Sequence, residues 1–220
     1  MAPNPPKICA ALVNDDLDVI NTNSLLVDMF EVRIDLIGKR WQQVAAHLKK
    51  PWIACNRRSD EGGKWGGKEA ERINELRDAL KLGAAIIDVE LATPSLADFV
   101  KEIKGKTKCL ISYHNVKETA SLEELRRIVN RQLKAGADIC KVVTTARAFA
   151  DNFVVLDLVA AFSPKIQIVS FAMGAQGKLS RILSPLAGGA FTYASAGQGK
   201  ESAEGQLTVK TLREIYGLIK

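Results

Sequence analysis

Apolar runs rich in β-branched residues recur along the chain, and each is bounded by polar residues, glycine or proline. This pattern is typical of buried β-strands. The runs begin at Ile8, Met29, Pro51, Ala85, Lys108, Ile139, Ile166 and Phe191. Apolar residues recur with helical periodicity over Lys68–Leu82, Ser121–Ala135, Arg147–Phe162 and Leu207–Ile219. The pattern therefore predicts strands that alternate with helices.

Successive strand starts lie 21 to 34 residues apart, which is too far for hairpins and suits a strand, a helix and two loops. Such crossovers make the strands parallel. Gly83 and Gly136 follow two predicted helices, where a left-handed cap is expected, and Ser95 and Ser121 stand at expected N-caps. These α/β units predict one single-domain (β/α)8 TIM barrel over residues 1–220, with a doubly wound open sheet as the alternative.

The composition is 47% hydrophobic and 25% charged in 220 residues, as in an ordinary globular protein with one sizeable core. No apolar run approaches the ~18 residues that span a bilayer, and Met1–Lys7 lacks the features of a signal peptide. The four cysteines form no C-x-x-C pair, so we expect buried, reduced thiols and no metal site. We therefore expect a cytoplasmic protein with no membrane partner.

The net charge of +6 favours anionic partners. The densest basic segment, Lys101–Lys108, contains no aromatic residue to stack on bases and is interpreted as a solvated helix end. We therefore expect no nucleic-acid partner, although a basic nucleic-acid-binding protein is kept as a third hypothesis. Gly174–Ser180 is similar to a phosphate loop, but Leu179 stands where Ser or Thr is required.

Polar residues gather at the predicted carboxyl ends of the strands, where the catalytic residues of barrel enzymes lie. Glu31, Arg33 and Asp35 occupy alternate positions, so we expect their side chains on one side of the second strand. Three charges on one face are costly unless they are paired or lie at a site. They indicate a salt-bridged strand or a face that binds an anion or hydroxyl groups.

The chain has only two histidines, and they fall in different contexts. His47 lies in the helical stretch Trp41–Lys50, which indicates a surface or packing role. His114 ends the fifth predicted strand, where a general acid-base residue is expected.

Lys141 lies inside an apolar strand, and lysine is rarely buried without a reason. Desolvation disfavours the ammonium form, so a neutral amine becomes available as a nucleophile toward a carbonyl. The other interpretation is an ion pair with Asp88 or Glu90 at the rim of the barrel, and the sequence leaves both open. Arginines near strand ends, Arg33, Arg57 and Arg181, indicate a small carboxylated or phosphorylated carbonyl substrate.

Together these motifs resemble type I 3-dehydroquinate dehydratase, the Schiff-base enzyme of the shikimate pathway, along nearly the full length of the chain. Each motif is weak alone, but their order and spacing are specific. The matching segments are Glu31–Asp35, Arg57–Gly63, Asp88–Leu91, Ser112–Asn115, Asp138–Val142, Met173–Gly174, Ser180–Arg181 and Ser202–Gln206.

The resemblance implies a homodimeric barrel without a cofactor that eliminates water from 3-dehydroquinate to give 3-dehydroshikimate. Lys141 would form an imine with the C3 ketone, which acidifies the C2 proton. His114 would help to form and hydrolyse the imine, remove that proton and protonate the departing C1 hydroxyl, while Glu61 orients the histidine. The implied substrate-binding residues are Glu31, Arg33 and Arg57 for ring hydroxyls, and Arg181, Ser202 and Gln206 for the carboxylate.

The chain departs from the family pattern at three places. Glu204 stands where the family usually has proline, Asn115–Val116 replaces a more usual Asp-Phe, and Ala11 replaces a substrate-binding serine of many members. A second Ser-Ala-Gly-Gln string at Ser195–Gln198 competes with Ser202 and Gln206, which we choose because a helix then follows as in the family.

A Schiff-base (class I) aldolase acting on a small sugar phosphate is the alternative function, because a strand lysine in a barrel serves that chemistry equally well. Such an aldolase should carry a phosphate loop after the seventh and eighth strands. The loop that begins at Gly174 is an unconvincing candidate for it.

Overall fold

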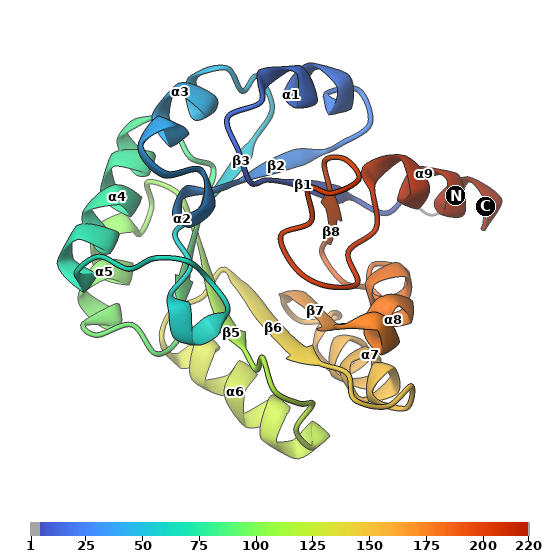
Figure 1. Ribbon diagram of the computed structural model, residues 1–220. Helices are drawn as coiled ribbons and strands as arrows, with labels where there is room; N and C mark the ends of the chain where they lie inside the picture. The colour runs from blue at the N-terminus through green and yellow to red at the C-terminus, as the bar shows by residue number, and fades with distance from the viewer. Residues whose placement is uncertain (1–4, 220) are drawn as a thin grey trace.

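The computed structural model describes residues 5–219, and its strands form one sheet that rolls into a barrel (Figure 1). Residues 1–4, part of the segment in which no signal peptide is expected, and residue 220 lie outside the described residues. The strands are β1 (Ile8–Leu12), β2 (Met29–Arg33), β3 (Trp52–Cys55), β4 (Ile86–Glu90), β5 (Lys108–His114), β6 (Ile139–Thr145), β7 (Gln167–Met173) and β8 (Thr192–Ser195).

All ladders between neighbouring strands are parallel, and the sheet order is β7-β6-β5-β4-β3-β2-β1-β8. The first and last strands of the sequence pair directly, with Ile8 opposite Thr192. This sequential order confirms the barrel and excludes the doubly wound sheet, in which the strand order reverses at a switch point.

One seam of the barrel carries no strand ladder within residues 5–219, and it lies between β7 and β8. At the amino end of the seam the Ala190 amide donates to the Ile168 carbonyl at 2.8 Å. Farther along, the rings of Phe171 and Tyr193 meet across the seam, with centroids 6.1 Å apart. Side chains therefore close the barrel where backbone pairing stops.

The helices lie outside the ring of strands, as Figure 1 shows, and the predicted ones are confirmed within a few residues. The helix predicted from Arg147 begins four residues later, because the Asp151 carboxylate accepts the amides of Arg147 and Ala148 in a turn. The helices are α1 (Leu17–Asn23), α2 (Ile34–Ile37), α3 (Trp41–Ala46), α4 (Glu69–Lys81), α5 (Leu96–Ile103), α6 (Leu122–Lys134), α7 (Asp151–Phe162), α8 (Lys178–Leu183) and α9 (Val209–Leu218).

The predicted caps are confirmed at three of four positions. Gly83 and Gly136 have φ angles of 86° and 97°, and the Ser121 side chain accepts the Glu124 amide. The prediction that the Ser95 side chain caps a helix is wrong, because Ser95 has φ 54° and its hydroxyl makes no capping hydrogen bond to α5. An N-cap residue normally has an extended backbone, from which its oxygen reaches the first-turn amides.

Inward-facing positions change from apolar to polar along several strands. In β3 to β6 the inner residue near the amino end is Ile53, Ile86, Leu110 or Ile139, and all four are buried. Two residues further along each strand, the residues on the same inner face are polar or charged. They are Cys55, Asp88, Ser112 and Lys141. The barrel therefore has an apolar base and a polar layer at its carboxyl end.

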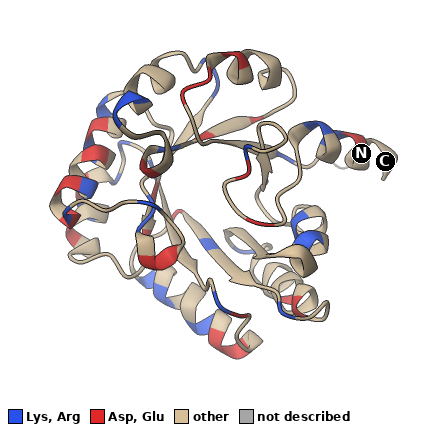
Figure 2. Ribbon diagram, viewed as in Figure 1, with Lys and Arg blue, Asp and Glu red and all other residues tan. Residues whose placement is uncertain are grey.

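Charged residues of both signs are interspersed on the outer helices, as Figure 2 shows for α4, α5 and α6. The four cysteines are free and buried, which confirms the prediction of buried thiols without disulfides. Among the helices in residues 5–219, none is long and apolar enough to cross a bilayer. His47 follows α3 as an exposed residue, as expected.

Candidate active site

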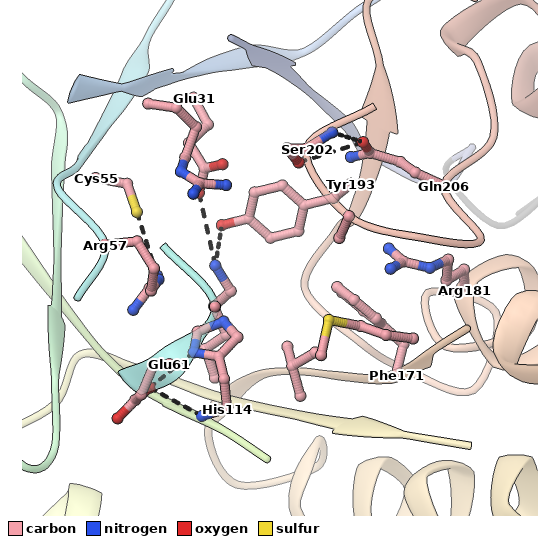
Figure 3. A pocket seen from close by; sticks show the side chains of 16 residues that line it. Glu31, Cys55, Arg57, Glu61, His114, Phe171, Arg181, Tyr193, Ser202 and Gln206 are labelled. Atoms are coloured by element: carbon pink, nitrogen blue, oxygen red, sulfur yellow. Dashed lines mark hydrogen bonds and ion pairs between the residues drawn. The ribbon is translucent and has the colours of Figure 1, made fainter. Parts of the chain in front are cut away.

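A pocket lies at the carboxyl end of the barrel, and it is lined by all nine residues to which the family resemblance assigned a catalytic or substrate-binding role (Figure 3). β2, β5 and β6 contribute side chains directly, and the loops after β3 and β8 and helix α8 contribute the rest. The nine are Glu31, Arg33, Arg57, Glu61, His114, Lys141, Arg181, Ser202 and Gln206. The structure thus brings together the full predicted set, and their individual roles stay predictions.

Lys141 is 4% exposed, and its amine faces three oxygen atoms. The Nζ atom donates to Asp88 Oδ2 at 2.9 Å and to Tyr193 Oη at 3.2 Å, and it lies 3.6 Å from Glu31 Oε1. This geometry confirms the ion pair with Asp88, whereas Glu90 is not a partner. The same amine lines the pocket, so the ion pair leaves the nucleophile hypothesis standing.

Burial alone does not make this amine neutral, and that part of the sequence argument is wrong. Burial lowers the pKa of Lys141, but the negative charges of Asp88 and Glu31 outweigh it, so that the pKa lies above its ordinary value. The carboxylates therefore hold the amine as an ammonium ion until something changes its surroundings.

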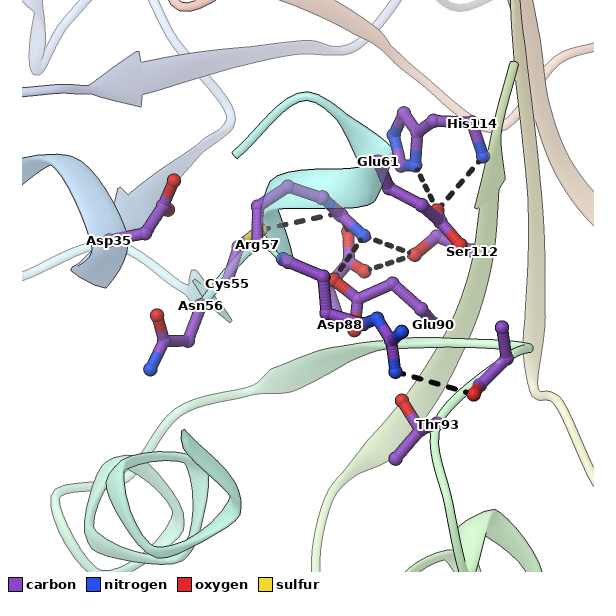
Figure 4. Close-up of polar contacts among 12 residues, drawn as sticks. Asp35, Cys55, Asn56, Arg57, Glu61, Asp88, Glu90, Thr93, Ser112 and His114 are labelled. Atoms are coloured by element: carbon purple, nitrogen blue, oxygen red, sulfur yellow. Dashed lines mark hydrogen bonds and ion pairs between the residues drawn. The ribbon is translucent and has the colours of Figure 1, made fainter. Parts of the chain in front are cut away.

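Asp88 is itself held by cations on both sides, as Figure 4 shows for the Arg57 side. Arg57 Nη2 donates to Asp88 Oδ2 at 2.7 Å, and the Ser112 hydroxyl donates to Oδ1 at 2.6 Å. Burial would raise the pKa of Asp88, but the charges of Arg57 and Lys141 hold it well below its usual range. Asp88 is therefore ionised throughout the neutral range.

Arg72 of α4 extends this network behind the pocket. It is fully buried and donates to Glu90 Oε2 at 2.7 Å, to the Asn56 carbonyl at 2.9 Å and to Thr93 Oγ1 at 2.9 Å. Glu90 also accepts from Arg57 Nη1 at 2.9 Å. Sequence reasoning missed Arg72, and the available signal was Glu90, a buried strand carboxylate that requires a cation.

His114 and Glu61 form a second polar pair in the pocket. Glu61 Oε2 lies 2.9 Å from His114 Nδ1 and also accepts the His114 amide at 2.9 Å. Burial lowers the pKa of His114 well below its usual value, and the cations of Arg57 and Lys141 lower it further. Burial raises the pKa of Glu61 to about 8. With Nδ1 bonded to Glu61, the Nε2 atom of a neutral imidazole is left for a ligand.

Two glycines explain how the loop after β3 presents Glu61. Gly62 has φ 82°, a left-handed conformation that ends the short turn at Ser59–Glu61. At Gly63 a Cβ atom would lie 2.0 Å from the Arg57 carbonyl oxygen. Larger residues would therefore displace the loop that carries Arg57 and Glu61.

The charged triple on β2 divides into two groups. Glu31 and Arg33 line the pocket as expected, but Asp35 lies in α2 and does not. The expectation for Asp35 is wrong because β2 ends at Arg33 and a helical turn begins at Ile34, which changes the direction of the side chains. Asp35 instead accepts from Arg33 Nε at 2.9 Å and Nη2 at 2.8 Å and so fixes the guanidinium.

Arg181 differs from the other buried arginines of the site. Its Nη2 atom donates to the Glu204 carbonyl at 3.2 Å, and its guanidinium lies 4.4 Å from the centre of the Phe171 ring. Among the described residues its Nε has no hydrogen-bond partner. No acidic side chain within residues 5–219 forms an ion pair with it, and burial lowers its pKa to about 10. Such a cation suits an anionic group of a ligand.

The loop after β8 brings Ser202 and Gln206 to the pocket, whereas Gln198 of the competing string does not line it. Gln206 Oε1 accepts the Ser202 amide at 2.8 Å, which leaves the two N–H groups of the Gln206 amide free to donate. Glu204, at the family's proline position, contributes its backbone carbonyl to Gly174 N and Arg181. The departure from proline therefore preserves a backbone contact with the pocket.

A cluster of metal-type ligand atoms lies at the pocket, and two of its three residues line it. Atoms of Glu31, Cys55 and Asp88 lie within 4.8 Å of one another. However, Arg57 Nη2 already contacts Cys55 Sγ at 3.2 Å and Asp88, and Lys141 bonds Asp88 as well. Two of the protein's own cations therefore neutralise this cluster.

The fold and the pocket define a (β/α)8-barrel enzyme in which acid-base side chains and an unpaired arginine face a small-molecule site. A family model described as "Type I 3-dehydroquinase" matches residues 8–220. The chain therefore belongs to the type I 3-dehydroquinase family.

Individual relatives agree with this assignment. A 3-dehydroquinate dehydratase of Dehalococcoides mccartyi is 46% identical over 211 residues, with 96% of this chain and 95% of the relative covered. One of Methanococcus maripaludis is 38% identical, with 96% and 99% covered. The crystal structure of 3-dehydroquinate dehydratase from Geobacillus kaustophilus is 25% identical and superposes with a TM-score of 0.87, covering 100% of this chain and 93% of that one.

Proposed function

We propose that this protein is a hydro-lyase that converts 3-dehydroquinate into 3-dehydroshikimate through an imine on Lys141, in the shikimate pathway to aromatic amino acids. The observation that carries the proposal is the position of Lys141 Nζ in the same pocket as His114 and Arg181. Curated relatives at 38% to 46% identity over nearly the whole chain are 3-dehydroquinate dehydratases.

The reaction begins with the amine of Lys141. The Lys141 ammonium first gives one proton to the neutral imidazole of His114, and the freed lone pair forms a bond to the C3 carbonyl carbon. The imidazolium returns that proton to the former carbonyl oxygen, which leaves as water, and a protonated imine results. The negative charge of Asp88, 2.9 Å from Nζ, stabilises the positive nitrogen of that imine. The imine then withdraws electrons from the neighbouring C2–H bond.

His114 moves the remaining protons. Because burial lowers its pKa, the imidazole is neutral and can remove the C2 proton, whose bonding electrons pass into the imine to give an enamine. The enamine electrons then expel the C1 hydroxyl, and the same imidazolium protonates it as water. Glu61, bonded to Nδ1, fixes the ring for both transfers. Hydrolysis of the imine releases the product and restores Lys141.

The binding residues divide the pocket by charge. Arg181, with the free amide N–H groups of Gln206 and the adjacent Ser202 hydroxyl, receives the substrate carboxylate. Glu31 and Arg33 receive ring hydroxyls, and in the described part of the chain the Oε1 atom of Glu31 has no hydrogen-bond partner. Arg57 lines the same pocket and receives a further ring hydroxyl in this proposal.

The alternative functions have less support in the same geometry. The Gly174 amide donates to Glu204 and the Gly177 amide donates to Gly174, so these two loop amides are not directed at a phosphate. A sugar-phosphate aldolase is therefore disfavoured. The interspersed charges of Figure 2 give no continuous basic face along α4 to α6 for nucleic acid.

Borohydride trapping tests the proposed function. The wild-type protein incubated with 3-dehydroquinate and borohydride should gain a stable adduct that maps to Lys141, because reduction converts the imine into a secondary amine. Lys141→Ala should gain none, while Lys134→Ala, a change at an exposed lysine of α6, should behave as wild type. A folded wild-type sample that yields neither adduct nor the absorbance of the conjugated enone would contradict the dehydratase proposal.

We also propose that the protein is a cytoplasmic homodimer. Two aromatic side chains at the start of α7, Phe149 and Phe153, are 54% and 53% exposed and pack edge to face. An exposed aromatic pair of this kind suits coverage by a second copy of the chain. Light scattering should give the mass of a dimer, and Phe153→Ser should shift the protein toward monomer.

The four free, buried thiols support a reducing compartment.

A further inference from the structure

Tyr193 lies against the amine of Lys141, although the sequence did not single it out. Its hydroxyl accepts a hydrogen bond from Nζ at 3.2 Å, and Nζ lies 4.3 Å from the centre of its ring (Figure 3). Phe171 and Phe191 pack edge-on against the ring, with centroids 6.1 and 5.4 Å away. The ring is 4% exposed, so the hydroxyl is held in one place beside the reacting nitrogen.

The three oxygen-bearing groups around Nζ have different hydrogen-bonding capacities. Asp88 and Glu31 are carboxylates, which when ionised can only accept hydrogen bonds. The Tyr193 hydroxyl can accept one hydrogen bond and donate another at the same time. Burial and the nearby charge of Glu31 raise the pKa of Tyr193 well above its ordinary value, so the phenol keeps its proton at neutral pH.

Imine formation requires a proton transfer that this geometry serves. When the amine attacks the carbonyl, the first adduct carries a positive nitrogen and a negative oxygen on the same carbon. A proton must pass from that nitrogen to that oxygen to give the neutral carbinolamine. Direct transfer would pass through a strained four-membered ring of nitrogen, hydrogen, oxygen and carbon.

We propose that Tyr193 is a catalytic residue whose hydroxyl relays this proton from Lys141 Nζ to the former carbonyl oxygen. One N–H proton passes to the phenol oxygen while the phenol proton passes to the substrate oxygen. The N–H and O–H bonds that break are replaced by an O–H bond on tyrosine and an O–H bond on the carbinolamine. The phenol therefore ends neutral, and the step needs no other acid or base.

The relay closes a six-membered ring of nitrogen, hydrogen, phenol oxygen, hydrogen, substrate oxygen and carbon. The 3.2 Å separation of Nζ and Oη provides one side of that ring before any substrate arrives. The relay acts before water is lost, so it is distinct from the proton transfers at C2 and C1 assigned to His114. It rests on the proposed imine chemistry, and it adds a second residue that touches the reacting nitrogen.

Tyr193→Phe tests the relay, because it removes the hydroxyl and keeps the ring contacts with Phe171 and Phe191. In rapid-quench borohydride trapping with 3-dehydroquinate, the rate of adduct formation should fall by about 10- to 100-fold, at or just below the lower end of the range for a lost proton-transfer group. KM should change little. Tyr216→Phe, which removes a hydroxyl of α9 that donates to the Ile182 carbonyl of α8, is the matched control and should keep the wild-type rate.

A solvent isotope effect separates relay from simple positioning. Adduct formation by wild type should slow in D2O because two protons move, and Tyr193→Phe should show a smaller effect. An unchanged trapping rate in Tyr193→Phe, or an equal isotope effect in both proteins, would overturn the proposal.

A second carbonyl keeps the test valid if 3-dehydroquinate is not the substrate. Formaldehyde with cyanoborohydride methylates lysines through a carbinolamine of the same kind. Peptide mapping then compares the methylation of Lys141 with that of exposed Lys134 in one sample. In Tyr193→Phe the rate of methylation of Lys141 should fall relative to that of Lys134. An unchanged ratio overturns the relay, whereas a lowered ratio without any 3-dehydroquinate adduct in wild type overturns the proposed function alone.

Discussion

Arg57 and Arg181 are both buried guanidinium groups that line one pocket, yet their surroundings differ. Arg57 donates to Asp88 and Glu90, whereas Arg181 meets a backbone carbonyl and an aromatic ring. Burial lowers the pKa of both, but the two carboxylates reverse that effect at Arg57. The comparison teaches that a paired arginine sets the charge of its buried neighbours, while an unpaired one is available for the anionic group of the proposed substrate.

The surroundings of Arg57 and those of Arg181 therefore contribute differently to the stability of the folded state. On the Arg57 side every charge has a partner, and removal of one partner leaves another charge buried alone. On the Arg181 side the cost of burying a cation is already present in the folded chain. The ligand, and not the fold, benefits from that cation.

The largest expected effect is a loss of stability when Arg57, the arginine paired with two carboxylates, is replaced. Arg57→Met leaves Asp88 and Glu90 with one cation fewer, and it should lower the free energy of unfolding by about 3–5 kcal/mol. Urea denaturation measures this loss. Arg58→Met is the matched control, because Arg58 pairs with the exposed Asp60, and it should cost at most about 1 kcal/mol. Equal urea midpoints for Arg57→Met and wild type would break the comparison.

The next effect is on binding and not on stability. Arg181→Met should raise KM for 3-dehydroquinate by about 10- to 150-fold, which corresponds to about 1.5–3 kcal/mol for a hydrogen bond to a charged group. Its urea midpoint should equal or exceed that of wild type, because an uncompensated buried cation is removed. Arg181→Lys keeps the charge and should fall between the two in KM. A clear loss of stability in Arg181→Met would mean that this arginine also serves the fold.

The smallest effect is on pH dependence. His114 must be neutral to act as a base, so kcat/KM should fall as the pH drops through its pKa. Because burial lowers the pKa of His114, with Arg57 and Lys141 acting in the same direction, this acid limb should lie below pH 6.5. The charges that act most strongly on His114 are those of Arg57, Lys141, Asp88 and Arg33, so Arg181→Met should leave the limb in place. A limb at or above pH 6.5 would contradict the assignment of a neutral imidazole.

The sequence predicted the barrel because its signals are local and repeated. Eight strand-like runs, the spacing between them and the caps at Gly83 and Gly136 all follow from residues close together in the chain. The pocket residues followed partly from position at strand ends and partly from family resemblance. The prediction for Asp35 was wrong because side chains alternate between the two faces only while the strand continues, and β2 ends two residues before Asp35.

Arg72 and Tyr193 could not be found from local pattern. Arg72 occupies a position in α4 that has Glu69 and Glu71 nearby in the sequence, as on a solvated helix face, and its burial depends on the approach of Glu90 from another element. Tyr193 stands in a run that is typical of a core strand, and only its distance to Lys141 distinguishes it from a packing aromatic. Both depend on contacts between distant segments, which a single sequence does not display.

The seam between β7 and β8 has a consequence for self-association. A rolled sheet still has two edge strands, and exposed edges offer unpaired amides and carbonyls to other chains. Here the two edges are directed at one another across the Phe171–Tyr193 contact, and one backbone hydrogen bond joins the segments near their amino ends. The same strands laid out as an open sheet would present both edges outward. Rolling the sheet thus protects the chain from edge-to-edge aggregation, with little need for charged or proline guard residues along those strands.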